Sequence, residues 1–251
     1  MSSKSIGIID SGLGGYTIFN ALRKAYPEVS FTLLADQKNS PFGNKSLEQL
    51  QEISDNLVKA LVERDIFEII IGCNTLNANV MDFLTEKYPE IVFHGVIDKT
   101  VESLPKKCKT ILILATEATT QSHAYQKAIT QVNQNAWVDE LAAPHLVDLI
   151  EGLADDVDID EMLEDLLASR DKVDAIVMGC THFPIVASNI KKISDATIVT
   201  SIEPMIDFLK GRDDLPLGGS YVLTTYDPVR MERQIEQLFS KKEFVDFMGE
   251  K

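Results

Sequence analysis

Two seven-residue segments of this chain are near-copies of each other, and they constrain its fold more than any other feature. Residues 69–75 read Ile-Ile-Ile-Gly-Cys-Asn-Thr, and residues 176–182 read Ile-Val-Met-Gly-Cys-Thr-His. Apolar runs of this length that end at a glycine are typical of fully buried parallel strands. Each segment therefore predicts a strand followed by a cysteine, at the edge where open α/β sheets bind ligands.

Cys73 and Cys180 occupy matching positions in these segments. A thiol at the N-terminus of a following helix has its pKa lowered toward thiolate, so we expect two activated thiols to face one small molecule from two sides. This arrangement suits an enzyme that removes a proton from one face of a carbon and returns it to the other. A single buried cysteine is often only a small core residue, but two in matching contexts favour chemistry. Cys108 lacks this context and is assigned to structure or surface.

Strand-like and helix-like segments alternate along the chain, which is typical of parallel sheets with right-handed crossovers. The expected strands are Ser5–Ile9, Phe31–Ala35, Glu68–Gly72, Ile91–Val96, Thr110–Ala115, Val138–Leu141, Ala175–Gly179, Ala196–Thr200, Tyr221–Thr225 and Phe244–Phe247. The expected helices include Thr17–Ala25, Ser46–Arg64, Asn77–Lys87, Thr120–Val132, Pro144–Leu153, Met205–Lys210 and Val229–Phe239. We interpret the acidic run Asp155–Asp160 as a solvated turn, with a cation site there as the less favoured alternative.

The pattern restarts after residue 100, and each half contains one glycine-cysteine segment. We therefore predict two similar three-layer α/β domains with mostly parallel sheets and the active site in the cleft between them. The first domain would comprise residues 1–97 plus 206–251 and carry Asp10 and Cys73. The second would comprise residues 98–205 and carry Glu151, Cys180 and His182.

Charge and composition exclude several classes of partner. The formal net charge of the 251 residues is −15 and the pI is about 4.7, whereas nucleic acids and anionic membranes bind basic patches. No apolar run approaches the roughly 18 residues of a membrane helix, and Met1–Ser5 begins no secretory leader. Three cysteines without a close-spaced pair fit a reducing cytoplasm. We therefore expect a cytoplasmic protein that binds a small molecule, and neither nucleic acid nor membrane.

Further polar residues lie near the predicted strand ends. Asp10 and Ser11 follow the first strand, where Ser11 can offer its hydroxyl to a ligand carboxylate and Asp10 is either functional or a turn former. His182 lies two residues after Cys180 and could orient a proton relay. For Glu151, the sequence alone favours an exposed position on an amphipathic helix.

Motifs for cofactors and metals are absent from the sequence. The Gly12-x-Gly14 segment lacks the last glycine of a dinucleotide-binding loop, because Thr17 stands there. No nucleophile elbow, Walker A loop or CxxC motif occurs, and the four histidines lack metal-ligand spacing. We expect neither a cofactor nor a metal ion.

Several motifs together carry a resemblance to a known family. They are Asp10-Ser11-Gly12-Leu13-Gly14-Gly15, Pro41-Phe42-Gly43, Cys73-Asn74-Thr75 and Gly179-Cys180-Thr181-His182, with weaker matches at Thr116-Glu117-Ala118-Thr119 and Leu149-Ile150-Glu151. In this combination and order the chain resembles the glutamate racemases of the cofactor-independent aspartate/glutamate racemase superfamily. His182 favours the glutamate branch, because the second cysteine motif of aspartate racemases typically ends in glutamate.

The resemblance implies that Cys73 and Cys180 act as an acid and base pair across the substrate Cα, with Asp10, Glu151 and His182 assisting proton movement. It also implies a substrate-binding set, namely Asp10, Ser11, Phe42, Gly43, Asn74, Thr75, Thr181 and His182. The substrate would be glutamate, whose D-enantiomer bacteria use in peptidoglycan, and the resemblance leaves room for a homodimer.

Three departures from the family pattern bear on substrate choice. Phe42 stands where tyrosine is usual, Asn39 where arginine is usual, and Asp148 where proline is usual. A racemase of another amino acid, such as aspartate, is therefore an alternative, as is a non-catalytic regulatory paralogue. A related decarboxylase is less favoured, because those enzymes use one cysteine. Circular dichroism of several L-amino acids after incubation with the protein separates these alternatives.

Overall fold

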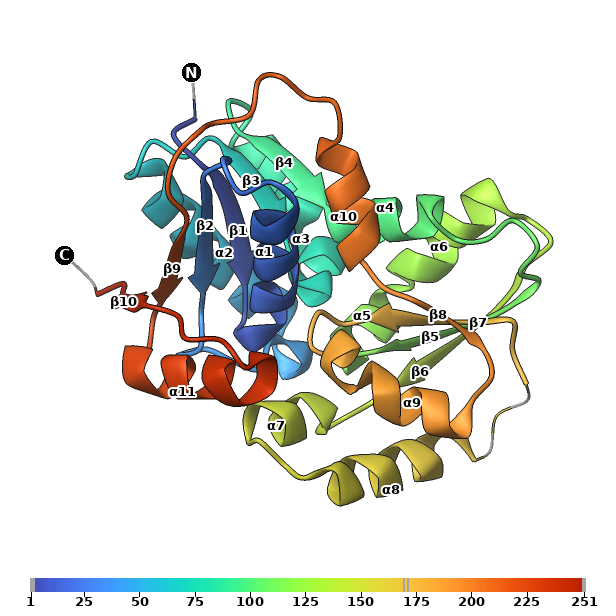
Figure 1. Cartoon of the computed structure of the whole chain (residues 1–251). Helices are drawn as coiled ribbons and strands as arrows, with labels where there is room; N and C mark the ends of the chain where they lie inside the picture. The colour runs from blue at the N-terminus through green and yellow to red at the C-terminus, as the bar shows by residue number, and fades with distance from the viewer. Residues whose placement is uncertain (1–2, 169, 171, 250–251) are drawn as a thin grey trace.

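The computed structural model describes residues 3–168, 170 and 172–249, and it contains two sheets with helices on both faces (Figure 1). The six-stranded sheet has the order β10-β9-β2-β1-β3-β4 and the four-stranded sheet the order β6-β5-β7-β8. The strands are β1 Ile6–Asp10, β2 Phe31–Ala35, β3 Glu68–Ile71, β4 Val92–Gly95, β5 Thr110–Ala115, β6 Trp137–Ala142, β7 Ala175–Gly179, β8 Thr197–Val199, β9 Tyr221–Thr224 and β10 Val245–Phe247. Each pairing between these strands is parallel. The predicted fold class, α/β with parallel sheets, is confirmed.

The helices follow the strands as crossovers. They are α1 Leu13–Ala25, α2 Leu47–Val62, α3 Asn74–Lys87, α4 Val96–Glu102, α5 Glu117–Ser122, α6 Ala124–Val132, α7 Leu146–Glu151, α8 Asp156–Leu167, α9 Ala187–Ile193, α10 Ile202–Leu209 and α11 Pro228–Phe239, with short 3-10 turns η1 Phe42–Asn44 and η2 Phe183–Val186. After α10 the chain returns to the six-stranded sheet, where it adds β9 and β10. Strand β9 pairs with β2, so residues from both ends of the chain lie side by side in Figure 1.

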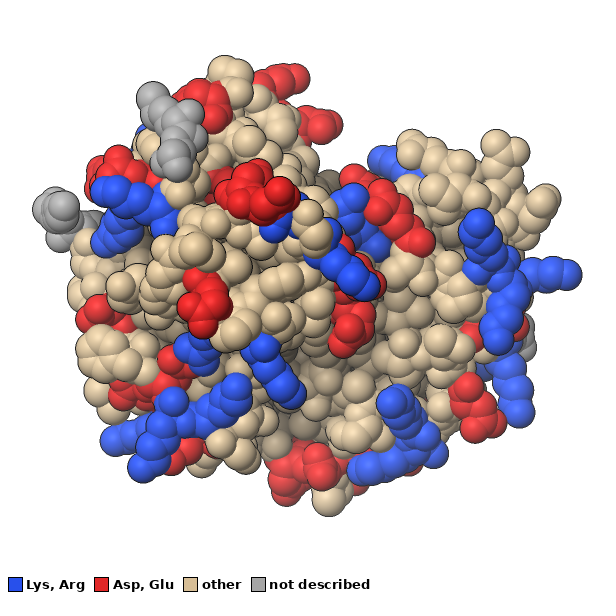
Figure 2. Space-filling model, turned by 45° about the horizontal axis from the view of Figure 1, so that its top comes forward, with Lys and Arg blue, Asp and Glu red and all other residues tan. Residues whose placement is uncertain are grey.

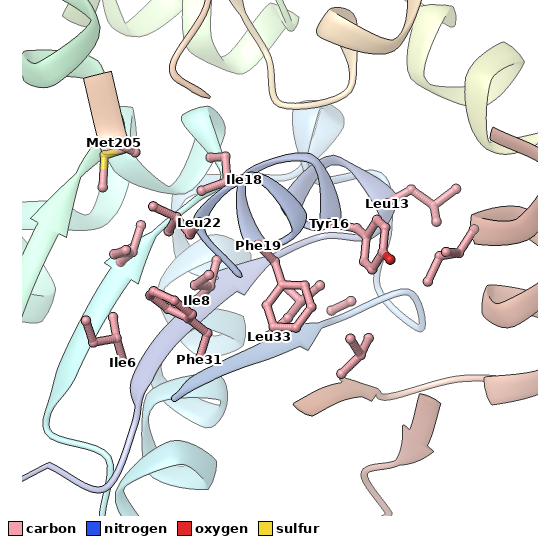
Figure 3. Close-up of a cluster of buried hydrophobic side chains, with 14 of the residues drawn as sticks. Ile6, Ile8, Leu13, Tyr16, Ile18, Phe19, Leu22, Phe31, Leu33 and Met205 are labelled. Carbon is pink, nitrogen blue, oxygen red and sulfur yellow. The ribbon is translucent and has the colours of Figure 1, made fainter. Parts of the chain in front are cut away.

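The six-stranded sheet is buried on both faces because consecutive strand residues point to opposite sides. Ile8 of β1 packs in a cluster with α1, α10 and α11, whereas its neighbour Ile9 packs with α2 and α3. Figure 3 shows the first cluster, in which the apolar side chains of α1 lie over those of β1 and β2. This sandwich fixes the position of the α1 N-terminus, which matters for the site described below.

The four-stranded sheet repeats this design. Leu112 and Leu114 of β5 pack with α7, α8 and α9, and the intervening Ile113 packs with α4 and α6. The paired apolar segments of the sequence, β3 and β7, are central strands in their sheets, each with a neighbour on both sides. Both runs are buried, as continuous apolar strands of parallel sheets should be.

Two local predictions are wrong, and a third differs only at its ends. The run Asp155–Asp160 is not a turn: Asp155 caps the N-terminus of α8 by accepting from the backbone N–H groups of Val157 and Asp158, and acidic side chains favour the first turn of a helix. The segment Thr120–Val132 is not one helix, because His123 has a left-handed backbone (φ 54°) that separates α5 from α6. The strand expected over Ile91–Val96 is present as β4 Val92–Gly95, and α4 begins at Val96.

Basic and acidic side chains are interspersed on the face of the molecule in Figure 2. Among the described helices, none combines the length and apolar character that crossing a membrane requires.

Candidate active site

Both glycine-cysteine loops line one cavity of about 180 Å³. Cys73 follows β3 and precedes α3, and Cys180 follows β7, so the two thiols come from the carboxyl ends of strands in different sheets. Each cysteine is 6% exposed. Most of the predicted site residues line this cavity, namely Ser11, Phe42, Gly43, Cys73, Asn74, Thr75, Cys180, Thr181 and His182. Asp10 and Glu151 do not line the cavity, but they contact Thr181 and His182, which do.

Asp10 ends β1 and is fully buried. One carboxylate oxygen accepts from the Gly12 backbone N–H at 3.0 Å, and the other accepts from the Thr181 hydroxyl at 2.9 Å. The second bond joins the two cysteine-bearing halves, because Thr181 directly follows Cys180. Burial raises the pKa of Asp10 against the opposing effects of His182 and these donors. A carboxyl with a raised pKa, held beside the cavity, suits proton transfer.

The prediction of a lowered pKa for Cys73 is wrong in direction. Burial, followed by the Asp10 charge, raises the pKa of Cys73 well above its ordinary value. The backbone N–H groups of Thr75 and Leu76 at the start of α3 act in the predicted direction, but burial outweighs them. Desolvation of the charge outweighs the helix N-terminus at this position.

His182 connects Cys180 to Glu151. Its Nδ1 lies 3.8 Å from the Cys180 sulfur, and its Nε2 lies 2.9 Å from Glu151 Oε1. Burial disfavours the imidazolium, but the contacts with Cys180 and Glu151 outweigh burial and raise the pKa of His182 well above its ordinary value. Burial also opposes charge on Glu151, yet the hydrogen bond from His182 lowers the pKa of that carboxyl. The arrangement favours an imidazolium beside the Cys180 sulfur.

Glu151 is therefore not a surface residue, and that interpretation of the sequence is wrong. Its side chain is 12% exposed and accepts from the backbone N–H of Leu13 at 3.1 Å. Helix α1 has no capping side chain of its own, so Glu151 supplies the anion that a helix N-terminus favours. The contact joins residues 138 positions apart, and a pattern within one helix cannot reveal it.

The glycines of the first loop make room for the protein's own side chains. A Cβ at Gly12 would collide with Glu151, and a Cβ at Gly14 would collide with Thr181 and lie 2.6 Å from His182 Nδ1. The Gly14 backbone N–H lies 3.1 Å from His182 Nε2, a contact that is a hydrogen bond only while Nε2 is unprotonated and that therefore opposes the imidazolium. The start of α1 thus forms the surface on which the second cysteine loop docks.

Asn74 offers an unused donor at the cavity. Its Oδ1 accepts from the Tyr125 hydroxyl at 2.6 Å, and its buried Nδ2 has no hydrogen-bond partner among the described residues. Buried amide hydrogens are rarely left unpaired, so this group fits a ligand acceptor. Sequence reasoning missed Tyr125, because nothing in the motif around Cys73 points to a tyrosine in α6.

Two threonine hydroxyls at the cavity, those of Thr75 and Thr116, belong to a cluster that also contains Thr119. Thr75 Oγ1 lies 2.9 Å from Thr116 Oγ1, and Thr119 Oγ1 lies 3.0 Å from Thr116 Oγ1. Thr116 was not among the predicted site residues, although the weaker motif at 116–119 was a signal for it. These hydroxyls can rotate to donate to a carboxylate.

The three departures from the family pattern have different positions. Phe42 and Asp148 line the cavity, and Asp148 lies 3.5 Å from His145 Nδ1. Asn39 donates to Asp36 at 2.8 Å and lies outside the lining set. Among the described residues that line the cavity there is no lysine or arginine, so the donors open to a ligand carboxylate are amides, hydroxyls and the two histidines His145 and His182.

Across the described part of the chain, no three or more histidine, cysteine, aspartate or glutamate side chains are grouped so as to hold a metal ion.

Comparisons with known proteins agree with this geometry. The family model described as Asp/Glu/Hydantoin racemase matches residues 17–207. The chain is 33% identical over 214 residues to the glutamate racemase of Aquifex aeolicus, covering 82% of this chain and 83% of the relative. It is 32% identical over 195 residues to that of Carboxydothermus hydrogenoformans, covering 76% and 73%.

Solved structures extend the similarity to the whole fold. The glutamate racemase isoform RacE1 of Bacillus anthracis matches with a TM-score of 0.90 at 27% identity, over 99% of this chain and 98% of the other. The glutamate racemase of Francisella tularensis, solved in complex with D-glutamate, matches with a TM-score of 0.89 at 25% identity over the same shares. The chain belongs to the Asp/Glu/hydantoin racemase family.

Proposed function

We propose that this protein is a cofactor-independent racemase that interconverts L- and D-glutamate with Cys73 and Cys180 as its acid and base. The observation that carries the proposal is that both thiols, from strand ends of different sheets, line one cavity. The identity with curated glutamate racemases supports glutamate as the substrate. The unpaired Asn74 amide and the threonine hydroxyls support recognition of a carboxylate by neutral donors.

The reaction conserves atoms and charge. One cysteine thiolate takes the Cα proton and becomes a thiol, and the other thiol gives its proton to the opposite face and becomes a thiolate. The carbanion between these steps is stabilised by donors to the substrate carboxylate, where negative charge develops. Because burial raises the pKa of Cys73, we propose that the substrate ammonium supplies the cation that makes its thiolate accessible.

The neighbouring residues would divide between the two thiols. The negative charge of Asp10 raises the pKa of Cys73, so Asp10 would adjust the proton affinity of the Cys73 thiol. His182, supported by Glu151, would do the same for Cys180. Ser11 and Thr181 line the cavity between these pairs and would orient the substrate.

We further propose that the chain works as two α/β domains, residues 1–97 with 206–251 and residues 98–205, with the cavity in the cleft between them. The lining of the cavity by loops from both sheets supports this division. In a bacterium the product D-glutamate would supply peptidoglycan synthesis. Cytoplasmic location and a homodimer stay predictions.

The test is circular dichroism of L-glutamate incubated with the purified protein, beside L-aspartate and other L-amino acids. We expect the signal of L-glutamate to decay to zero and Cys73→Ser and Cys180→Ser to abolish the decay. Because Glu117 and Asp148 line the cavity, the second candidate is a racemase of a less acidic amino acid. Decay with such a substrate alone would favour that candidate, and no decay with any amino acid would contradict racemisation.

A further inference from the structure

Glu151 occupies a position that its own helix does not stabilise. It is the last residue of α7, a helix of six residues, which is too short to be stable without external contacts. A carboxylate at a helix C-terminus is disfavoured by the helix dipole. The carboxylate nevertheless bridges the α1 N-terminus and His182, so contacts from outside α7 must hold it there.

Two glutamine side chains supply such contacts. Gln234 of α11 donates from Nε2 to the backbone oxygen of Glu151 at 2.6 Å. Gln37, in the loop after β2, donates to Gln234 Oε1 at 3.0 Å and to Glu151 Oε2 at 3.4 Å. Thr224 of β9 donates to Gln37 Oε1 at 3.3 Å. We call Gln37 and Gln234 the glutamine clasp.

The hydrogen bonds of the clasp fix the orientation of both amides. Gln37 uses its Nε2 for two acceptors and its oxygen for one donor, and Gln234 uses both ends of its amide. Rotating the Gln234 amide by 180° would place its oxygen against the Glu151 backbone oxygen and its nitrogen against the Gln37 nitrogen. Only the observed arrangement pairs donors with acceptors.

Burying the Gln234 amide costs free energy, which its hydrogen bonds only offset. Gln234 is 2% exposed and lies on α11 between the buried Met231 and Ile235. A leucine would fill such a helix position without the cost of burying an amide. The clasp also joins the two parts of the molecule. Gln37 and Gln234 belong to the segments around the six-stranded sheet, and Glu151 belongs to those around the four-stranded sheet. Figure 1 shows α11 beside α7 at this junction.

We propose that Gln37 and Gln234 are positioning residues that hold Glu151 against His182, and thereby set the proton affinity on the Cys180 side of the cavity. This rests on the proposed racemase function for its kinetic consequence. Neither glutamine lines the cavity, so loss of the clasp should change proton transfer and leave substrate binding intact.

The test uses Gln37→Met, Gln234→Met and the double variant, which keep side-chain length and remove the amides. We expect kcat to fall about tenfold in each single variant with little change in KM, since an angstrom of misplacement can cost about a hundredfold. The double variant should be less impaired than the product of the singles, because both act through Glu151. The ring ¹⁵N signals of His182 should shift from their wild-type values, because the Glu151 carboxylate that faces Nε2 would be displaced.

Asn189→Leu is the matched control. Asn189 is a buried amide (3% exposed) that bonds Asp160 of α8 at 2.8 Å, away from the cavity. This variant should lose thermal stability with unchanged kcat and unchanged His182 signals. Clasp variants with wild-type kcat and wild-type His182 signals would overturn the proposal. If the wild-type protein racemised no amino acid, the proposed function would fail, and the His182 signals alone would decide the positioning claim.

Discussion

The Gly14→Ala variant probes how closely the second cysteine loop docks on α1. A methyl group at this position would collide with Thr181 Oγ1 and lie 2.6 Å from His182 Nδ1. Neither side chain can retreat without loss, because Thr181 donates to Asp10 and His182 contacts Glu151. The loop that carries Cys180 must therefore move relative to α1.

Two opposing contributions set the change in the free energy of unfolding. Gly14 is the second residue of α1, and alanine in place of glycine stabilises a helix by about 1 kcal/mol. Overpacking a close-packed site costs about 1–3 kcal/mol. We expect a net loss of about 1 kcal/mol, or about 3 °C in Tm for a chain of this size. The loss in kcat/KM should be larger, about a hundredfold for an angstrom of displacement.

Thermal unfolding and the circular dichroism assay with L-glutamate measure the two effects together. Ala21→Gly, further along α1, is the control: it should lower Tm through helix propensity and leave kcat/KM unchanged. A Gly14→Ala protein that is more stable than wild type and fully active would refute the docking argument, since propensity alone would then account for the result.

Two further substitutions test other contacts of the site. Tyr125→Phe removes the donor to Asn74 Oδ1, so the amide can turn; we expect KM to rise about fivefold, in line with a lost hydrogen bond of roughly 1 kcal/mol, and an unchanged KM would contradict the assigned orientation. Glu151→Gln removes the ion pair with His182, whose loss costs at most about 3–5 kcal/mol. Because folding raises the pKa of His182, its protonation stabilises the folded state fully at a pH below 6.5, the ordinary pKa of histidine. This stabilisation is lost as the pH rises through the raised pKa. Because folding lowers the pKa of Glu151, its ionisation stabilises the folded state fully at a pH above 4.5, the ordinary pKa of glutamate. This stabilisation is lost as the pH falls through the lowered pKa. The difference in unfolding free energy between wild type and variant, measured by denaturant titration, should therefore be largest from pH 4.5 to 6.5, and a difference that does not vary with pH would contradict the pairing.

The sequence predicted the sheets well because their signal is local. Buried parallel strands are continuous apolar runs, and the segments before Cys73 and Cys180 are of this kind. The same segments placed each thiol at the carboxyl end of a strand, which is the edge of its own sheet where ligands bind. The start of helix α2 at Ser46 was also predictable from the sequence, because Ser46 and Gln49 form a complete capping box.

The remainder depends on contacts between distant segments. The role of Glu151 at the start of α1, the docking space at Gly14 and the Tyr125 bond to Asn74 each join residues far apart in the chain. The raised pKa of Cys73 is likewise a consequence of burial, which a helix N-terminus in the sequence does not reveal. The break at His123 is a left-handed residue within a helical pattern, and no glycine marks it.

Deuterium incorporation at Cα tests the central claim, that two thiols act from opposite faces, most directly. L-glutamate is incubated with the protein in D₂O, and both enantiomers are separated and analysed by mass spectrometry early in the reaction. A thiol carries one proton, and the thiol that donates has exchanged with solvent. We therefore expect the D-glutamate formed to carry deuterium while the remaining L-glutamate carries almost none. Equal deuterium in both enantiomers, or retention of the substrate proton in the product, would indicate a single base and contradict the two-cysteine account.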